Sequence, residues 1–190
     1  FEWVKSYKGE KVSLEGGDAW IITGSPQSVN DELDWMLALE EEIRNVQHHN
    51  KPILGICFGH QLIAKSYGGR VELNPMGWEL GAYSITLTKR GMSDKIFSDF
   101  FNYSMVYESH MDCVTILPEN AIELAFNNKG NQAFKIHDNI YGVQFHPEFA
   151  YEVMKQYVNV RSSKGIVAEK MSIPKSNQGK VILSNFIDLI

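Results

Sequence analysis

Two short apolar runs and one helical repeat dominate the first third of the chain. Residues 19–23 and 53–56 are almost entirely apolar and lie next to glycine or proline, as is typical of strands buried on both faces. Between them, apolar residues recur at helical spacing from Leu33 to Val46, and Asn30 or Asp31 is placed to cap that helix. A strand, a helix and a strand with short connections predict a βαβ unit of a parallel sheet. Residues 1–7 alternate loosely, which predicts a further strand ahead of this unit.

The pattern changes after residue 69. Short strand-like runs, separated by turn signals, cover residues 70–72, 83–88, 105–107, 114–117, 122–126 and 133–136. They predict an antiparallel section attached to the parallel core. Residues 140–145 predict another buried strand, and residues 149–160 and 181–190 predict helices. The fold class that follows is α/β, with a mainly parallel sheet, helices on both faces and a small antiparallel section.

Composition narrows the possible partners. A chain of 190 residues fits one domain with a substantial core. Its net charge of -5 argues against nucleic acid and anionic membrane surfaces as partners. No apolar run approaches the ~20 residues of a membrane helix, so no membrane association is expected. The two cysteines form no disulfide framework, and we therefore expect a reducing, cytoplasmic setting.

The second buried strand leads into a turn with the sequence Gly-Ile-Cys-Phe-Gly, residues 55–59. This is the cysteine counterpart of the Gly-x-Ser-x-Gly nucleophile elbow. The flanking glycines have a steric purpose, since a side chain there would collide with the neighbouring backbone. Cys57 at the start of a helix is a candidate nucleophile, and the helix N-terminus is expected to favour its thiolate.

A thiol nucleophile needs a base, and the base needs an orienting group. Of the six histidines, His146 is the strongest candidate because it directly follows a buried strand, where the carboxyl ends of parallel strands meet. Glu148, two residues on, can hold the imidazole in one tautomer. His110 remains open as a residue that shapes the site. The other histidines are weaker candidates, at a helix end, close to the elbow in sequence, or in a turn: His48, His49, His60 and His137.

The segments Gly55-Ile-Cys-Phe-Gly-His-Gln61 and His146-Pro-Glu148 together resemble the class I, triad-type glutamine amidotransferases. The resemblance runs from about residue 20 to 149. Residues 77–81 and 109–112 look like the glutaminase domain of GMP synthetase and its stand-alone relatives.

That resemblance implies a flavodoxin-like domain over residues 1–190 that needs no cofactor or metal. It also implies a triad in which Cys57 attacks, His146 is base and then acid, and Glu148 orients it. The backbone N–H groups of Phe58, Gly24 and Ser25 would form the oxyanion hole. Gln61, Gly24 and Ser25 would contact the substrate.

Two departures from the family pattern stand out. The loop that usually reads Gly-Gly-Pro is Gly24-Ser25-Pro26, which is expected to restrict the backbone of the oxyanion hole. The strand and helix that usually open the domain have no counterpart, so we expect the sequence to begin inside it.

Three functions stay open. The first is a glutaminase that gives ammonia to an ATP-dependent synthetase subunit or domain. The second is a stand-alone hydrolase of γ-glutamyl peptides, which the Thr23-Gly24-Ser25-Pro26 loop resembles. The third is a non-catalytic module, which the complete triad disfavours.

Overall fold

The computed structural model describes residues 2–14, 16–46, 50–165, 173–175 and 177–190. Its main sheet is six-stranded, in the order β1-β2-β10-β9-β8-β5. The strands of this sheet are β1 (Trp20–Ile22), β2 (Ile53–Ile56), β5 (Thr86–Leu87), β8 (Ala121–Asn127), β9 (Gly130–Ile136) and β10 (Ile140–Val143). Two-stranded ladders pair β3 (Arg70–Leu73) with β7 (Asp112–Ile116) and β4 (Glu79–Ser84) with β6 (Met105–His110). The α-helices are α1 (Asp34–Val46), α2 (Phe58–Ser66), α3 (Lys89–Ser93), α4 (Tyr151–Ser163) and α5 (Val181–Ile187).

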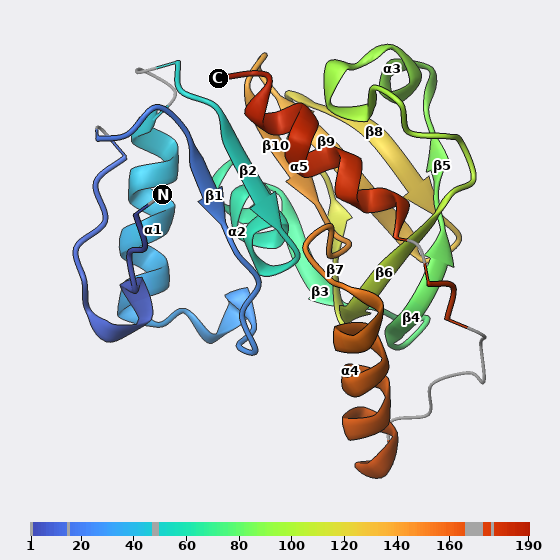
Figure 1. The fold of residues 1–190 in the computed structure, drawn as a ribbon. Helices are drawn as coiled ribbons and strands as arrows, with labels where there is room; N and C mark the ends of the chain where they lie inside the picture. Colours follow the sequence, from blue (N-terminus) through green and yellow to red (C-terminus); the bar gives the residue numbers. More distant parts are fainter. Residues whose placement is uncertain (1, 15, 47–49, 166–172, 176) are drawn as a thin grey trace.

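The main sheet joins a parallel half to an antiparallel half (Figure 1). Strands β1, β2 and β10 are parallel, with Ile22 opposite Gly55 and Val143 opposite Ile56. From β10 onward the pairings with β9, β8 and β5 are antiparallel. The carboxyl ends of the three parallel strands therefore lie at one edge, which is where active groups collect in α/β sheets.

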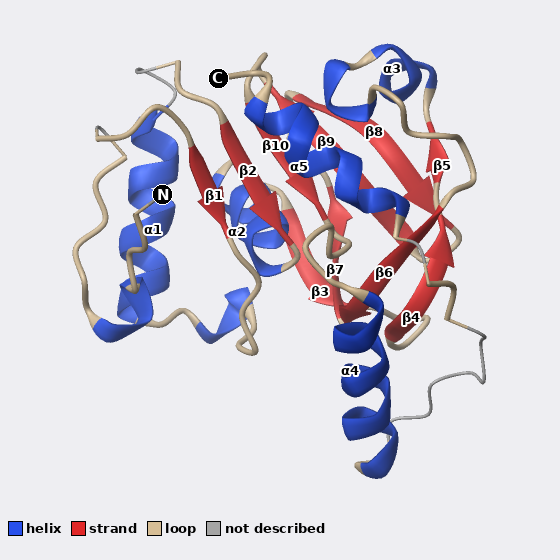
Figure 2. Ribbon diagram, viewed as in Figure 1, coloured by secondary structure: helices blue, strands red, loops and turns tan. Residues whose placement is uncertain are grey.

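Helices cover both faces of the sheet (Figure 2). On one face α1 and α2 pack on Ile53 and Ile140, and on the other α5 packs on Leu54 and Tyr141. Successive residues of β2 thus point into different cores, because side chains alternate along a strand. This explains why both faces of the strand are apolar, and the predicted α/β fold is confirmed.

Several local predictions need correction. The strand predicted at residues 1–7 is wrong for the described part, where Ser6–Lys8 is a short 3₁₀ helix and Trp3 is 78% exposed. The cap predicted for the helix is also wrong, since Ser28 caps a 3₁₀ turn over Val29–Asp31 and α1 begins only at Asp34. The run at residues 83–88 is divided between β4 and β5, because the chain leaves one ladder there and joins another sheet. In the last case the strands available for pairing, and not the local pattern, decided where the strands lie.

Among the described residues, no helix combines the length and apolar character needed to cross a bilayer.

Candidate active site

The Cys57 elbow lies between β2 and α2, and its backbone is strained. Cys57 has φ 52° and ψ -99°, a conformation that L-residues rarely adopt. Its backbone N–H donates to the Val143 carbonyl at the end of β10, 2.9 Å away, which fixes the turn against the neighbouring strand. The strain is therefore held in place by the sheet on which the elbow sits.

Two glycines make this elbow sterically possible. A Cβ built on Gly55 would lie 2.5 Å from the carbonyl of Gly59, and one on Gly59 would lie 2.2 Å from the Ile22 carbonyl oxygen. Both distances are far inside van der Waals contact. The steric reason predicted for the glycine spacing is therefore confirmed: α2 starts in direct contact with β1 and β2.

Gly24, at the end of β1, has the thiol-bearing residue and the imidazole as its neighbours. An ideal Cβ on Gly24 would lie 3.3 Å from His146 Cε1 and 3.9 Å from Cys57 Cβ. Cys57 and His146, 89 positions apart in sequence by their numbers, thus meet around one glycine. Both residues are only 6% exposed.

His146 is held from three directions. Its Nδ1 lies 2.7 Å from Glu148 Oε1, its backbone N–H donates to the Tyr107 carbonyl at 2.8 Å, and its ring stacks on Phe149 at 4.0 Å between centroids. An ionised carboxylate only accepts, so the neutral imidazole carries its hydrogen on Nδ1 and leaves Nε2 with a lone pair. This is the tautomer that a base requires.

The ionisation of Cys57 differs from the expectation. Burial and the carboxylates of Glu108 and Glu148 raise the pKa of the Cys57 thiol, although the Phe58 N–H and the Arg161 guanidinium act in the opposite direction. The predicted preference for thiolate is therefore wrong for this closed site. The helix N-terminus has the expected sign, but desolvation outweighs it, so the pKa of the thiol lies above its ordinary value.

The loop after β1 accommodates serine without strain. Neither Gly24 nor Ser25 has a positive φ, and the Ser25 Oγ accepts a hydrogen bond from the Gln27 N–H at 3.2 Å. The expected restriction of the backbone by Ser25 therefore has no consequence here, because this position does not need the conformational freedom of glycine. The backbone donors expected for the oxyanion hole belong to this loop, in which Gly24 lies close to Cys57, and to Phe58, the residue after Cys57.

Gln61 is oriented by its own hydrogen bonds. Its Nε2 donates to the Asp112 carbonyl at 2.9 Å and to Gln144 Oε1 at 3.1 Å, and the residue is 4% exposed. Its place in the first turn of α2 puts it beside the elbow, where it joins α2 to β7 and to the segment after β10.

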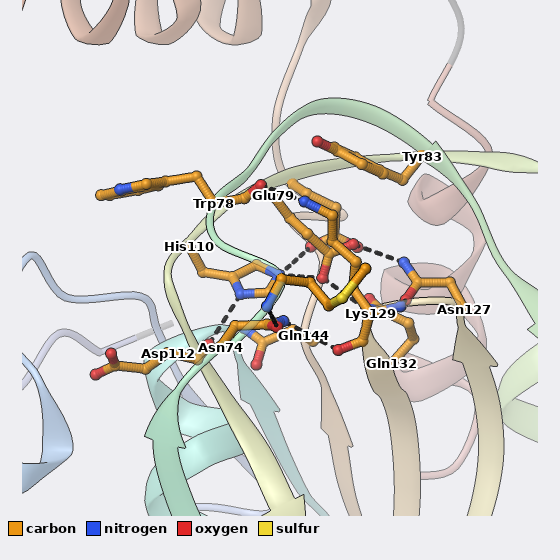
Figure 3. A network of polar contacts seen from close by, with 12 residues as sticks. Asn74, Trp78, Glu79, Tyr83, His110, Asp112, Asn127, Lys129, Gln132 and Gln144 are labelled. Atoms are coloured by element: carbon orange, nitrogen blue, oxygen red, sulfur yellow. Dashed lines mark hydrogen bonds and ion pairs between the residues drawn. The ribbon is translucent and has the colours of Figure 1, made fainter. Parts of the chain in front are cut away.

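A second histidine is surrounded by acceptors (Figure 3). His110 Nε2 lies 3.2 Å from Glu79 Oε2 and 3.2 Å from Glu108 Oε2, while Nδ1 lies 2.9 Å from the Asp112 carbonyl. Burial alone would lower the pKa of His110, but its contacts with Glu108 and Glu79 raise it to about 10. The ring is therefore an imidazolium.

The two carboxylates around His110 are not equivalent. Glu79 also accepts from Asn127 at 2.6 Å and Gln132 at 3.1 Å, and although burial opposes it, the contacts with His110 and these amides lower the Glu79 pKa. Among the described residues, Glu108 has no such amide donors beyond its contact with His110, and burial raises its pKa to about 7. Of the two carboxylates, Glu108 is therefore the one whose pKa is raised.

The two other histidines that the structure describes, His60 and His137, lie outside this geometry. His60 is fully buried against Phe134, with ring centroids 4.8 Å apart, and burial lowers its pKa to about 3. His137 lies in the turn after β9, as expected. His48 and His49 fall outside the described residues. Within the described chain, no three His, Cys, Asp or Glu side chains are arranged to hold a metal ion.

Sequence reasoning missed two supports of the site. Asn177 donates to the carbonyl of His146 at 2.8 Å and to that of Phe149 at 3.3 Å. It lies in a polar stretch with no periodicity, so no local signal points to it. Glu79 and Glu108 are charged residues on strands, and nothing in their neighbouring sequence indicates that both are buried.

Comparisons with known proteins identify relatives of this chain. A sequence model described as glutamine amidotransferase class-I matches residues 2–162. The chain is 42% identical over 152 residues to one of the subunits of glutamine-hydrolysing GMP synthase from Pyrococcus abyssi, covering 79% of this chain and 72% of that protein.

It is also 35% identical over 148 residues to gamma-glutamyl peptidase 4 of Arabidopsis thaliana, covering 76% of this chain. The chain spans 59% of the length of that plant protein and 62% of gamma-glutamyl peptidase 3 from the same plant.

The fold is that of a glutamine amidotransferase structure from Methylobacillus flagellatus, with a TM-score of 0.80 at 20% identity, covering 99% of this chain and 84% of that one.

Proposed function

This chain belongs to the glutamine amidotransferase class-I family, and we propose that it hydrolyses the γ-amide of glutamine or of a γ-glutamyl compound through a thioester on Cys57. The observation that carries the proposal is the meeting of Cys57 and His146 around Gly24, with Glu148 bonded to the far side of the imidazole. A nucleophile, a base and an orienting carboxylate in that order are the parts that covalent acyl transfer requires.

The first half-reaction forms the thioester. Cys57 Sγ attacks the amide carbon while its proton passes to His146 Nε2, so that a buried thiol is never required to persist as an anion. The oxyanion accepts from the N–H groups of Phe58, Gly24 and Ser25, each worth about 3 kcal/mol in a preorganised site. The C–N bond then breaks, and His146 gives the proton to the departing amine.

The second half-reaction releases glutamate. Water takes the place of the amine, His146 removes its proton, and the resulting hydroxide attacks the thioester carbon. Collapse of the second tetrahedral intermediate breaks the C–S bond, and the proton on His146 returns to the sulfur of Cys57. Glu148 keeps the imidazole in one tautomer throughout, while Gln61 lies beside the elbow to contact the substrate.

Glutamine is the first candidate substrate. A relative described as part of a glutamine-hydrolysing GMP synthase supports ammonia as the product and an ATP-dependent synthetase subunit or domain as its receiver. Relatives described as gamma-glutamyl peptidases support a second candidate, in which the leaving group is an amino acid or peptide. The two free, buried cysteines fit a reducing compartment such as the cytoplasm.

The mechanism is tested by product release and by trapping. Purified protein with glutamine or a γ-glutamyl peptide should release glutamate, and acid quenching should leave a glutamyl adduct on the peptide that contains Cys57. Cys57→Ala should abolish both signals. Cys113→Ala is the matched control, because Cys113 is also buried but lies on β7. Undiminished hydrolysis by Cys57→Ala would remove the proposal.

A further inference from the structure

A continuous series of rings extends from His146 along α4. The His146 ring stacks on Phe149 at 4.0 Å, and Phe149 lies 5.0 Å from Tyr157. The Arg161 guanidinium lies 5.6 Å from the Tyr157 ring and 4.6 Å from the Trp78 ring. We call these four residues, Phe149, Tyr157, Trp78 and Arg161, the α4 wall.

The outer end of the α4 wall carries a positive charge, that of Arg161. Arg161 forms no ion pair within the described residues, and its buried Nε has no hydrogen-bond partner there. The contacts of the guanidinium with two aromatic rings satisfy none of its five donors. A buried donor without a partner costs free energy, so the arrangement is explained best by a ligand that accepts.

The charge of Arg161 also reaches the reacting sulfur. The guanidinium lowers the pKa of the Cys57 thiol against the opposing effect of burial. Tyr157 is 40% exposed whereas Phe149 is 8% exposed, so the α4 wall is closed beside His146 and open to solvent farther out. In Figure 1, α4 is the helix that extends away from the main sheet, on the side where β4 lies.

Proton transfer decides which part of the substrate faces this wall. In the proposed mechanism His146 protonates the departing amine, so the leaving group must lie on the His146 side of the scissile bond. Ammonia would make no use of rings and a guanidinium beyond His146. An amino acid or dipeptide would extend along the rings, since two extended residues span about 7 Å, and would bring its carboxylate towards Arg161.

We propose that the α4 wall is the leaving-group subsite and that Arg161 determines specificity by binding a free carboxylate on the leaving group. The substrate class is then a γ-glutamyl peptide with a free C-terminus. The planar guanidinium fork suits a carboxylate better than a lysine ammonium does, because it offers two parallel N–H donors. This inference rests on the Cys57 mechanism proposed above and chooses between its two candidate substrates.

The experiment compares acids with amides. γ-Glutamylglycine and γ-glutamylglycylglycine are each assayed as the free acid and as the C-terminal amide, which differ only in the charge that Arg161 would bind. One of the two free acids will be the better substrate. Wild-type protein should cleave that acid with a kcat/KM about 10- to 100-fold above that of the corresponding amide, as expected for one charge-assisted contact. Arg161→Gln should bring the ratio of acid to amide kcat/KM to about one, whatever the change in the two absolute rates, and Arg161→Lys should keep part of the preference.

The control is Arg90→Gln, which makes the same change of charge at an exposed position on α3. Equal cleavage of acid and amide by wild-type protein, or an acid preference that survives in Arg161→Gln, would overturn the inference and leave Arg161 as a packing residue.

Binding separates this inference from the mechanism. Calorimetry with Cys57→Ala should give tighter binding of acid than of amide, and the difference should vanish in Cys57→Ala/Arg161→Gln. If Cys57→Ala still hydrolyses the peptides, the thioester mechanism fails, yet the acid–amide difference still reports on Arg161. If hydrolysis stops in Cys57→Ala but binding shows no difference, the mechanism stands and the subsite fails.

Discussion

Two of the histidines that the structure describes each contact glutamate, and their surroundings differ. His146 contacts one carboxylate: its Nδ1 lies 2.7 Å from Glu148 Oε1, and the Glu148 side chain is 40% exposed. His110 has two carboxylates near Nε2 and a carbonyl near Nδ1, with its side chain 3% exposed. One nitrogen of His146 is therefore available to exchange a proton, whereas both nitrogens of His110 are in contact with acceptors.

The comparison teaches that a carboxylate beside histidine does not by itself indicate a base. A single carboxylate orients the ring and leaves the other nitrogen available. Acceptors at both nitrogens trap the imidazolium, which then acts as a fixed cation between strands β4 and β6. Through the Asp112 carbonyl, His110 also contacts the group that orients Gln61.

The largest expected effect is on catalysis at His146. His146→Asn should lower kcat/KM by about four orders of magnitude, the upper end for general acid–base catalysis, because one ring serves both half-reactions. Hydrolysis rates at saturating and limiting substrate would measure this. His110→Asn is the matched variant, and activity per folded molecule should fall much less. An equal loss in both would erase the distinction between the two histidines.

The next effect is on folding, and it belongs to His110. His110→Gln should destabilise the protein by about 3–5 kcal/mol, since it leaves two buried carboxylates without their cation. Urea unfolding would measure the free energy. Glu108→Gln in the same chain should recover part of the loss, because it removes one of those charges. A single variant as stable as the wild type would show that His110 is not the cation we infer.

Removing the orienting carboxylate should have a smaller effect. Glu148→Gln should lower kcat about 100-fold, or about 2.7 kcal/mol of barrier, because the amide can present its N–H to Nδ1 and favour the wrong tautomer. Water can reach this exposed residue and limit the loss. The measurement is the kcat of Glu148→Gln. The control is Glu152→Gln, which makes the same change of charge in the first turn of α4. A Glu148→Gln enzyme with the kcat of the control would contradict the role of Glu148.

The smallest effect is a pH dependence of stability from His110. Its folded pKa of about 10 lies above its ordinary value of 6.5, so its contribution is complete below about pH 6.5 and is lost as the pH rises towards 10. The Glu108 pKa of about 7 has the same sign, but it acts mainly between its ordinary 4.5 and 7. Wild-type unfolding free energy should therefore fall from pH 7 to 9, on the order of 2 kcal/mol.

Urea midpoints at pH 7, 8 and 9 would measure this slope. The double variant Glu108→Gln/His110→Gln should show a flatter profile, while Glu79, whose pKa is lowered, contributes no slope in this range. A wild-type profile that is flat, or a double variant with the same slope, would contradict the assignment of charge in this cluster.

Much of the fold was accessible from local pattern. The buried run at Ile53–Ile56 and the helical repeat before it marked the parallel unit, because burial on both faces leaves a continuous apolar run. Trp20–Ile22 forms the other predicted strand, but it is the edge strand β1 and leaves Ile21 37% exposed, so the predicted burial on both faces is wrong there. Where the chain had no such constraint the predictions failed. The loose alternation before residue 8 found no strand to pair with, so Trp3 stays exposed.

Spacing indicated the elbow of this protein, since glycines lie two positions either side of Cys57, although the contact that requires Gly59 is with Ile22 on the separate strand β1. The buried strand that ends just before His146 indicated that residue, and Glu148 follows two positions later. Only the tertiary structure decided the raised pKa of the Cys57 thiol, the contacts of His110 with two carboxylates and, among the described residues, the lack of a hydrogen-bond partner for Arg161 Nε. The reason is physical: desolvation and Coulomb interactions depend on which distant side chains share a buried space, and no local pattern contains that distance.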